Sequence, residues 1–301
     1  MTTQATVTSQ QQAALTELPP PSSSFKRFLR VFLARKVVIV GLLVILALIL
    51  MAIFAPVLAP HDPYAQNLAN SLQKPSSEHL LGTDLLGRDV LSRIIYGSRV
   101  SLMVGIVVVL LGGTLGMAIG LISGYFGGVI DSILMRIMDA IIAIPMIILA
   151  MALGAAMGGG ITNVILALGI AITPTYARLM RGQVLSIKQQ DYVIAGELTG
   201  ASNLRNILVH VFPNSISPLI VLITMNLGMA ILAEAGLSFL GLGIAPPGAA
   251  WGAMVNDGYR YLLAHPLLSV APGLCVMIVV LAFNIVGDAL RDALDPRLRG
   301  D

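Results

Sequence analysis

Six stretches of this sequence are long and apolar enough to cross a lipid bilayer, and they constrain the fold more than any other feature. They occupy residues 37–59, 100–122, 137–157, 161–177, 216–238 and 267–287. A membrane-spanning helix needs about 20 mostly apolar residues. The chain is 56% hydrophobic and only 11% charged, whereas a soluble domain carries about 25% charged residues. The sequence therefore predicts an all-α polytopic membrane protein with six transmembrane helices, of which the fourth, containing Pro174, has the least certain ends.

The distribution of Lys and Arg predicts the orientation of the chain. Basic residues gather before the first segment, after the fourth and after the sixth, at Lys26, Arg27, Arg30, Arg35, Lys36, Arg178, Arg181, Lys188, Arg205, Arg291, Arg297 and Arg299. Because cytoplasmic loops carry an excess of Lys and Arg, we expect both termini in the cytoplasm. Loop 60–99 falls outside on this topology, and its four basic residues can pair with its four acidic ones.

The apolar segments divide the chain into four parts. Residues 1–36 are predicted to form a disordered cytoplasmic tail, rich in Gln, Thr, Ser and Pro, that ends in a basic flank. Residues 37–99 hold the first transmembrane helix and an external loop. Residues 100–290 form a five-helix core with a cytoplasmic loop at 183–213, and residues 291–301 form a cytoplasmic C-terminal tail.

Glycine recurs at every fourth position from the second apolar segment into the loop that follows it. The five positions are Gly112, Gly116, Gly120, Gly124 and Gly128. On a helix this spacing gives a smooth stripe that another helix can approach closely. The stripe can serve packing within the chain or a seam between two subunits, and packing within the chain is the favoured interpretation.

Ionisable residues at bilayer depth are scarce, which limits the possible energy sources. Asp131, Arg136 and Asp139 lie at the start of the third segment, where Arg136 can pair with either acid. Glu234 lies near the outer end of the fifth segment. Charges inside a membrane usually mark ion pathways, so an ion-coupled mechanism has few groups to use. An ion-coupled secondary carrier that works without an ATPase is the alternative hypothesis.

The sequence offers no catalytic machinery. A phosphate-binding loop requires Lys directly after Gly, and none of the four Lys residues follows one. Ser238 lies among small residues, as a membrane protease nucleophile can, but no His follows it at membrane depth. We therefore expect no catalytic residue, no metal site and no cofactor held by this chain. Four histidines are interpreted as surface or interfacial hydrogen-bonding residues: His61, His79, His210 and His265.

The longest polar insert in the second half of the chain, residues 191–214, begins with the pattern of a short helix. Asp191 can cap this helix. Its apolar residues recur at helical spacing, at Tyr192, Ala195 and Leu198. Gly200 can end it, because the residue after a helix often adopts the left-handed conformation.

A second short helix is predicted directly after the glycine. Ser202 can cap it, and Pro213 is expected to end it before the next span. Its apolar residues are predicted to share one face, at Leu204, Ile207, Leu208 and Val211. A helix–glycine–helix unit at a membrane surface is suited to docking on a partner.

This insert resembles the cytoplasmic coupling motif of ABC importer permeases in its peptide-importer form, which contains Y-V-x-A-A, G-A-S and I-x-x-H-x-x-P-N. The agreeing residues are Tyr192, Val193, Ala195, Gly200, Ala201, Ser202, Ile207, His210, Pro213 and Asn214. Gly196 departs from the second Ala. Ile194 stands where the general motif, E-A-A-x3-G-x9-I-x-L-P, has its Glu.

Three further blocks resemble the C-type subunit of dipeptide, oligopeptide and nickel importers. They are HLLGTDLLGRDVLSRIIYGSRVSL at 79–102, AEAGLSFLGLGIAPPGAAWGAM at 233–254 and LAFNIVGDALRDALDPRLRG at 281–300. With the coupling motif, these blocks cover most of the chain from Phe25 onward in the order of that family. The chain is therefore identified as a member of the inner-membrane permeases of ABC importers, and the type I importer permease fold is expected.

The resemblance implies a bacterial inner-membrane location and several partners. These are a homologous B-type permease, two ABC ATPase subunits that bind ATP and Mg²⁺, an external solute-binding protein and the lipid bilayer, without nucleic acid. The chain would form half of the path of an ATP-driven importer of di- or oligopeptides. The residues do not choose among dipeptides, oligopeptides, nickel chelates, glutathione and opine-like compounds as cargo.

The resemblance also implies roles for individual residues. The ATPase-coupling residues are Tyr192, Val193, Ala195, Gly196, Gly200, Ala201, Ser202, His210 and Pro213. In the outer loops, Asp84, Arg88, Asp89 and Trp251 are candidates for contact with the binding protein. Arg88 and Asp89 can equally pair with neighbouring residues, and an interfacial anchor is the favoured role for Trp251.

Overall fold

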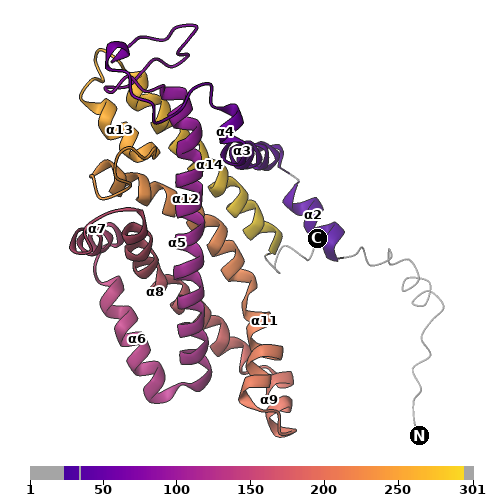
Figure 1. Ribbon diagram of the computed structural model, residues 1–301. Coiled ribbons are helices and arrows are strands. Elements are labelled where there is room, and N and C mark those ends of the chain that lie inside the picture. The colour runs from indigo at the N-terminus through magenta and orange to yellow at the C-terminus, as the bar shows by residue number, and fades with distance from the viewer. Residues whose placement is uncertain (1–23, 34, 295–301) are drawn as a thin grey trace, which may run out of the picture.

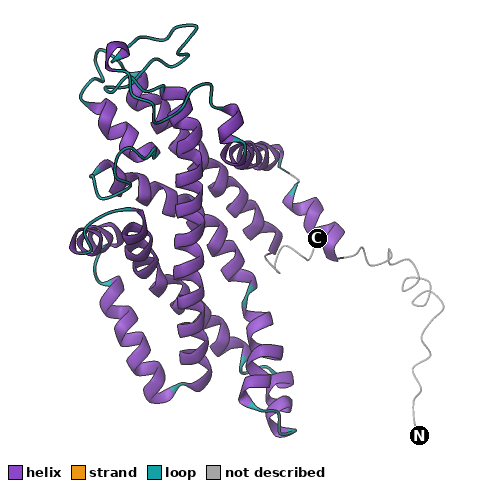
Figure 2. Cartoon of the chain, viewed as in Figure 1, coloured by secondary structure: helices purple, strands orange, loops and turns teal. Residues whose placement is uncertain are grey.

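The computed structural model describes residues 24–33 and 35–294, and the regular structure within these ranges is helical (Figure 2). An isolated bridge between Thr83 and Asp89 is the one β-type pairing found there. The all-α prediction is therefore confirmed for the described residues. Residues 1–23 and 295–301 of the predicted tails lie outside the described part. Residues predicted as disordered near the end of the first tail instead form helix α2 (Ser24–Phe32).

Five helices are long and apolar enough to cross a bilayer. They are α3 (Lys36–Ile53), α5 (Val90–Phe126), α8 (Ile161–Ile187), α12 (Ser217–Phe239) and α14 (Leu267–Leu294). Each coincides with most of one predicted segment. Their outward faces carry large exposed apolar side chains, such as Val40 and Leu43 of α3, as expected of helices that face lipid.

The third predicted segment, 137–157, is not one straight span. It is divided between α6 (Gly128–Ile142) and α7 (Met146–Ala156), which meet at 89°. Pro145 directly precedes α7. Proline has no N–H to donate and disfavours a helical conformation in the residue before it, so the chain breaks here. The bent pair supplies the sixth apolar unit if it forms one broken span.

Two helices extend well beyond the predicted apolar segments. Helix α5 begins at Val90, inside the region predicted as external loop, because the Asp89 side chain caps it by accepting a hydrogen bond from Ser92 N. Helix α8 continues through Pro174 to Ile187. The Thr173 hydroxyl donates to the Gly169 carbonyl beside this proline, at 2.7 Å.

The long helix α5 forms the axis of the molecule, with α8 and α12 packed beside it and α14 packed against α12 (Figure 1). One end of the molecule, here the α9 end, carries α9 (Asp191–Leu198), and the opposite end, here the α13 end, carries α13 (Trp251–Tyr259) and residues 60–89. The remaining short elements are α4 (Ala55–Leu58), η1 (Leu68–Asn70), α10 (Asn203–Arg205), η2 (Asn206–Val211) and α11 (Phe212–Ser215).

The glycine stripe of α5 packs against α8 within the same chain. A Cβ at Gly112 would lie 2.6 Å from the carbonyl oxygen of Gly169, and one at Gly124 would lie 2.9 Å from Cβ of Val184. Gly116 and Gly120 make equally close approaches to α8. Packing within the chain is therefore confirmed for these four glycines. Gly128 lies beyond the end of α5 with φ of +56° and has no neighbour within 4 Å, so it is not part of the stripe.

Candidate functional site

Helix α9 begins and ends as a separate unit at the end of the molecule. Its first residue is Asp191, whose side chain makes no capping hydrogen bond, so the prediction that Asp191 is the cap is wrong. The carboxylate instead lies in the first turn, where it interacts favourably with the helix dipole. Gly200 adopts φ of +82°, as predicted for the residue that ends this helix. The backbone N–H groups of Gly200 and Ala201 donate to the carbonyls of Glu197 and Gly196, each at 3.0 Å.

The segment after Gly200 stays helical farther than predicted. Ser202 caps α10 by accepting a hydrogen bond from Arg205 N at 3.4 Å. The chain then passes through the π-helical turn η2 into α11, where Pro213 occupies the first turn. Proline is tolerated there because the first N–H groups of a helix have no intrahelical partner. The prediction that Pro213 ends the second helix is therefore wrong.

The α9 end presents large apolar side chains to its surroundings. On α9 these are Tyr192, Ile194 and Leu198, and Leu198 is 84% exposed. On α10 and η2 they are Leu204, Leu208 and Val209. The predicted common face is thus split, because Ile207 and Val211 are buried while Leu204 and Leu208 point outward. We call these six exposed residues the coupling surface. Several large exposed apolar side chains on neighbouring short helices are typical of a partner-binding site.

Buried contacts hold the coupling surface to the rest of the chain. Val193 is fully buried beneath α9. The Tyr125 hydroxyl at the end of α5 donates to Asn203 Oδ1 at 3.2 Å, and Lys188 Nζ donates to the Tyr125 carbonyl at 2.6 Å. Tyr192 lies edge-on to His210, with ring centroids 6.1 Å apart. The sequence did not single out Tyr125 or Asn203, because their contact joins positions 78 residues apart.

Asn206 occupies an unusual position between α9 and η2. Its side chain is fully buried, and neither its amide nitrogen nor its oxygen has a hydrogen-bond partner in the described part of the chain. Its oxygen faces Gly196, where an added Cβ would lie 2.8 Å away. The absence of a side chain at Gly196 therefore makes room for Asn206. This gives a physical reason for the residue that departs from the second Ala of the resembling motif.

Two ion pairs connect α6 to α8, the helix that precedes α9. Arg181 binds Asp131 through two hydrogen bonds of 2.6 and 2.7 Å. Arg178 donates to Asp139 at 2.6 Å. The acids are thus paired with α8, and the prediction that Arg136 pairs with one of them is wrong. A span-to-span contact of this kind cannot be read from spacing along one helix.

At the α13 end, the predicted binding-protein contacts lie inside the fold. Arg88 Nε donates to Asp84 Oδ2 at 2.6 Å, and both residues are buried. Asp89 is 2% exposed and bonds to His79 and Ser92. These acids and Arg88 therefore pair with neighbours, which was one of the two alternatives, and direct contact with another protein is not carried forward for them.

Trp251 is also buried and is not an interfacial anchor. It has no exposed surface, and its Nε1 donates to the Ile94 carbonyl at 2.9 Å. Its ring covers Gly97, where an added Cβ would lie 2.8 Å from the indole. The expectation that this residue anchors at the membrane interface is therefore wrong. Trp251 instead packs α13 against α5.

A cavity of about 430 Å³ opens at the α13 end. Its walls include Arg88, Arg93, Asp257, Pro246 and the glycines at 158–160. Arg93 holds the loop wall by donating to the carbonyls of Pro247 and Gly248, each at 3.3 Å. Burial raises the pKa of the Asp257 carboxyl, while Arg93 and Arg88 act in the opposite direction. The cavity combines charged and apolar walls at the end opposite the coupling surface.

Ser238, considered as a protease nucleophile, is a buried structural residue. Its hydroxyl donates to Glu234 Oε1 at 2.6 Å, and Ser101 donates to the other carboxylate oxygen at 3.4 Å. Among the described side chains, no His lies at hydrogen-bond distance from Ser238. The Ser238 hydroxyl thus has no histidine partner among the described residues, and its bond to Glu234 belongs to a buried contact of α12 with Ser101 of α5.

Comparison with known proteins identifies the family of this helical arrangement. Residues 116–300 match the model of the family described as binding-protein-dependent transport system inner membrane component. Residues 23–75 match the N-terminal transmembrane domain of oligopeptide transport permease C. The chain belongs to the binding-protein-dependent transport permeases. The family predicted from the sequence is thus confirmed.

Curated relatives of this permease match along nearly their whole length. The dipeptide transport system permease protein DppC of Alkalihalophilus pseudofirmus is 41% identical over 94% of this chain and 92% of its own. The glutathione transport system permease protein GsiD of Escherichia coli is 40% identical over 96% of this chain and 97% of its own. Both are permease subunits of transport systems.

A solved structure supports the fold of the permease. A chain of the inward-facing MetNI methionine ABC transporter matches 68% of this chain and 97% of its own length, with a TM-score of 0.54 and 19% identity. This permease thus has the type I ABC importer fold. It is a non-catalytic subunit of an ABC importer and a multi-pass protein of the inner membrane. An importer of this kind implies ATPase and binding-protein partners.

Proposed function

We propose that this permease forms half of the translocation path of an ATP-driven importer of di- or oligopeptides. The coupling surface carries this proposal, because it offers exposed apolar side chains on a segment that the rest of the chain holds in place. The relatives named for dipeptide and glutathione transport support a peptide cargo. The remaining subunits would be a homologous B-type permease, two ATPases that bind ATP and Mg²⁺, and an external binding protein.

The proposed orientation places the α9 end and both termini in the cytoplasm and the α13 end outside. Loop 183–213 then faces the ATPases, and residues 60–89 with α13 face the binding protein. The Lys and Arg residues that lie before the first apolar segment, after the fourth and after the sixth support this orientation. The cavity beside Arg93 and Asp257 would lie on the delivery side of the path.

The contacts of α9 suggest how a push from the ATPases would reach the membrane. Helix α9 follows α8 after a break of only Lys188–Gln190, and η2 leads through α11 into α12. Val193 and Ile207 are buried between these elements. A force on α9 would therefore move the ends of α8 and α12 together, as packed helices transmit rigid-body shifts. The Asp131–Arg181 pair would carry the shift onward to α6.

The decisive experiment compares two exposed leucines at opposite ends of the chain. Leu198→Ala alters the coupling surface, whereas Leu263→Ala removes a fully exposed side chain from the α13 end. In the complete complex, we expect Leu198→Ala to reduce transport and substrate-stimulated ATP hydrolysis at least tenfold, which corresponds to about 1.4 kcal/mol. Leu263→Ala should retain both.

A second pair of variants tests the joint at Gly200. The residue needs a positive φ, which Asn tolerates and Val does not. Gly200→Val should uncouple ATP hydrolysis from transport, and Gly200→Asn should preserve the coupling. Wild-type coupling in Gly200→Val and Leu198→Ala would refute the proposal, as would gradient-driven, ATP-independent uptake by the isolated chain.

A further inference from the structure

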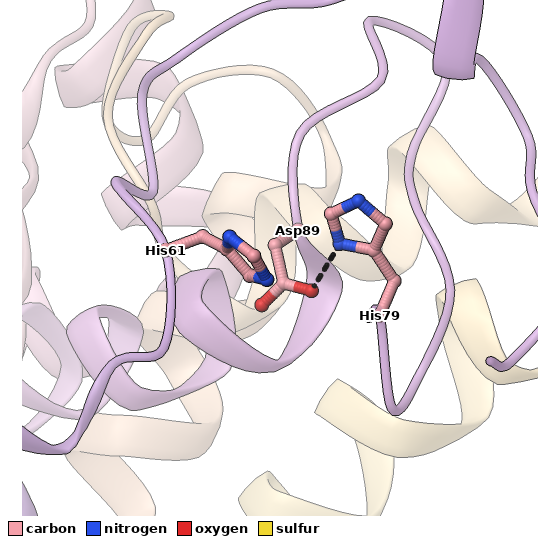
Figure 3. A group of neighbouring side chains, drawn as sticks. All are labelled: His61, His79 and Asp89. Carbon is pink, nitrogen blue, oxygen red and sulfur yellow. Dashed lines mark hydrogen bonds and ion pairs between the residues drawn. The ribbon is translucent and has the colours of Figure 1, made fainter. Parts of the chain in front are cut away.

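Three side chains that are far apart in the sequence converge at the α13 end. They are His61, His79 and Asp89, and their imidazoles lie on two sides of the carboxylate (Figure 3). One ligand atom from each residue lies within 4.8 Å of the others. The two imidazole centroids are 4.7 Å apart. From the sequence these histidines were interpreted as separate surface residues, because 18 positions separate them and no metal-binding spacing links them.

The surrounding hydrogen bonds orient the carboxylate of Asp89 and hold it against His79. Ser92 donates to Asp89 Oδ2 through its backbone N at 2.8 Å and its hydroxyl at 2.7 Å. The other oxygen, Oδ1, faces His79 Nδ1 at 2.9 Å. Asp89 is 2% exposed and His79 is 6% exposed. Both groups are therefore held in position by the fold before any ligand binds.

His61 is oriented by two further contacts. Its backbone N–H donates to the Ser92 hydroxyl at 3.0 Å, and its Nε2 bonds to the Glu78 carbonyl at 2.8 Å. A carbonyl oxygen only accepts, so Nε2 carries the proton in this state and Nδ1 has a free lone pair. A backbone carbonyl that orients one ring nitrogen is a usual outer partner of a metal-binding His. His61 is only half-buried, which leaves access from the surface.

We propose that His61, His79 and Asp89 form a binding site for a divalent transition-metal ion of the Zn²⁺ class. Two imidazoles and one carboxylate suit Zn²⁺, Ni²⁺ or Cu²⁺, whereas Mg²⁺ and Ca²⁺ require oxygen ligands. Ligand atoms around tetrahedral zinc lie about 3.4 Å apart, given metal–ligand distances of about 2.0–2.1 Å. The present separations, within 4.8 Å, would have to shorten on binding, and the half-buried His61 is the least enclosed of the three residues. Water completes the fourth position.

Metal binding through His79 Nδ1 requires a change of tautomer in that ring. The proton that His79 shares with Asp89 moves from Nδ1 to Nε2 of the same neutral ring, and the metal takes its place between the two residues. The metal then connects three segments: the one after α4, the turn at 79 and the start of α5. The site thereby fixes residues 60–89 to α5 at the α13 end. This inference does not depend on the cargo or on ATP coupling.

The test uses the full-length chain without a histidine tag, purified in detergent after treatment with a chelator. Isothermal titration with Zn²⁺ measures stoichiometry and affinity, and Co²⁺ absorption reports the ligand geometry. We expect one ion per wild-type chain and a tetrahedral Co²⁺ spectrum. His61→Ala should weaken binding at least tenfold, whereas His265→Ala, a matched change in the other loop of the same end, should bind as wild type does.

His61 is the informative position because His79 and Asp89 already stabilise each other without a metal. Its half-buried ring can be removed with little effect on folding, and His61→Gln provides a second variant that keeps a polar side chain there. The melting temperature without metal should match that of the wild type in both variants, and Zn²⁺ should raise it only in the wild type and in His265→Ala. Absence of a stoichiometric ion in the wild type, or unchanged affinity in both His61 variants, would overturn the site.

Discussion

Gly112 of α5 lies directly against Gly169 of α8, where a methyl group at Gly112 would come 2.6 Å from the Gly169 carbonyl oxygen. The adjacent residue, Gly113, lies beside the Tyr176 ring with room for a methyl group at 3.7 Å. Two neighbouring glycines on one helix thus differ in the space that a side chain would have: none at Gly112 and enough for a methyl group at Gly113. Helices in a membrane associate through such close packing, because lipid offers no hydrophobic driving force between them.

Substitution of these two glycines by alanine should have opposite effects on stability. Gly112→Ala forces α5 and α8 apart and should destabilise the fold by about 1–3 kcal/mol. Gly113→Ala should be neutral or stabilise by up to about 1 kcal/mol, because alanine has the higher helix propensity. Thermal unfolding in detergent measures the difference. Equal melting temperatures for the two variants would show that the stripe does not determine helix packing.

The two ion pairs between α6 and α8 should also contribute unequally. Asp131 and Arg181 form a bidentate pair with side chains 19% and 34% exposed, whereas Asp139 and Arg178 are about half exposed. Asp131→Asn should destabilise by about 1–3 kcal/mol, and the control Asp139→Asn by less than about 1 kcal/mol. The double variant Asp131→Arg/Arg181→Asp exchanges the two charges, and it should recover part of the stability that either single charge reversal loses in thermal unfolding. A double variant less stable than either single reversal would argue against a direct pair.

Gly196 and Asn206 should be energetically coupled. Gly196→Ala places a Cβ 2.8 Å from the Asn206 oxygen, so we expect a loss of stability and of ATP coupling. In an Asn206→Ala background the added methyl group meets no oxygen, and the effect of Gly196→Ala should shrink. A double-mutant cycle, read by thermal unfolding and by ATPase activity of the complex, should give an interaction of about 1 kcal/mol. Strict additivity would mean that the two residues do not restrain each other.

The sequence predicted features that depend on local pattern and missed those that depend on contacts between helices. Apolar length located the membrane helices, the glycine period located the α5–α8 contact, and Gly200 and Ser202 had the predicted local roles. The partner of Asp131 was missed, because Arg181 lies 50 residues away on another helix.

The same limit explains the errors at the α13 end. Asp84, Arg88 and Asp89 are charged residues in a predicted loop, which suggested exposure. They are instead buried where two stretches of the loop lie side by side. The backbone N–H of Leu72 donates to the Asp84 carbonyl, and that of Thr83 donates to the Gln73 carbonyl. Neither this pairing of the two stretches nor the approach of His61 to His79 leaves a periodic signal in the sequence. Charge alone therefore did not distinguish a surface contact from an internal pair.

The burial of Trp251 can be measured directly, because it is the only tryptophan in the chain. In the isolated subunit its fluorescence should be blue-shifted and weakly quenched by acrylamide, since the indole has no exposed surface. Brominated lipids should also quench it weakly, whereas an interfacial anchor would be quenched strongly.

Trp251→Phe removes the hydrogen bond to the Ile94 carbonyl and should destabilise the fold by about 1–3 kcal/mol. Tyr259→Phe, at a residue 62% exposed on the same helix, should leave stability within about 0.5 kcal/mol of the wild type. Strong lipid quenching together with an unchanged melting temperature in Trp251→Phe would place the indole at the membrane interface and not in the contact between α13 and α5.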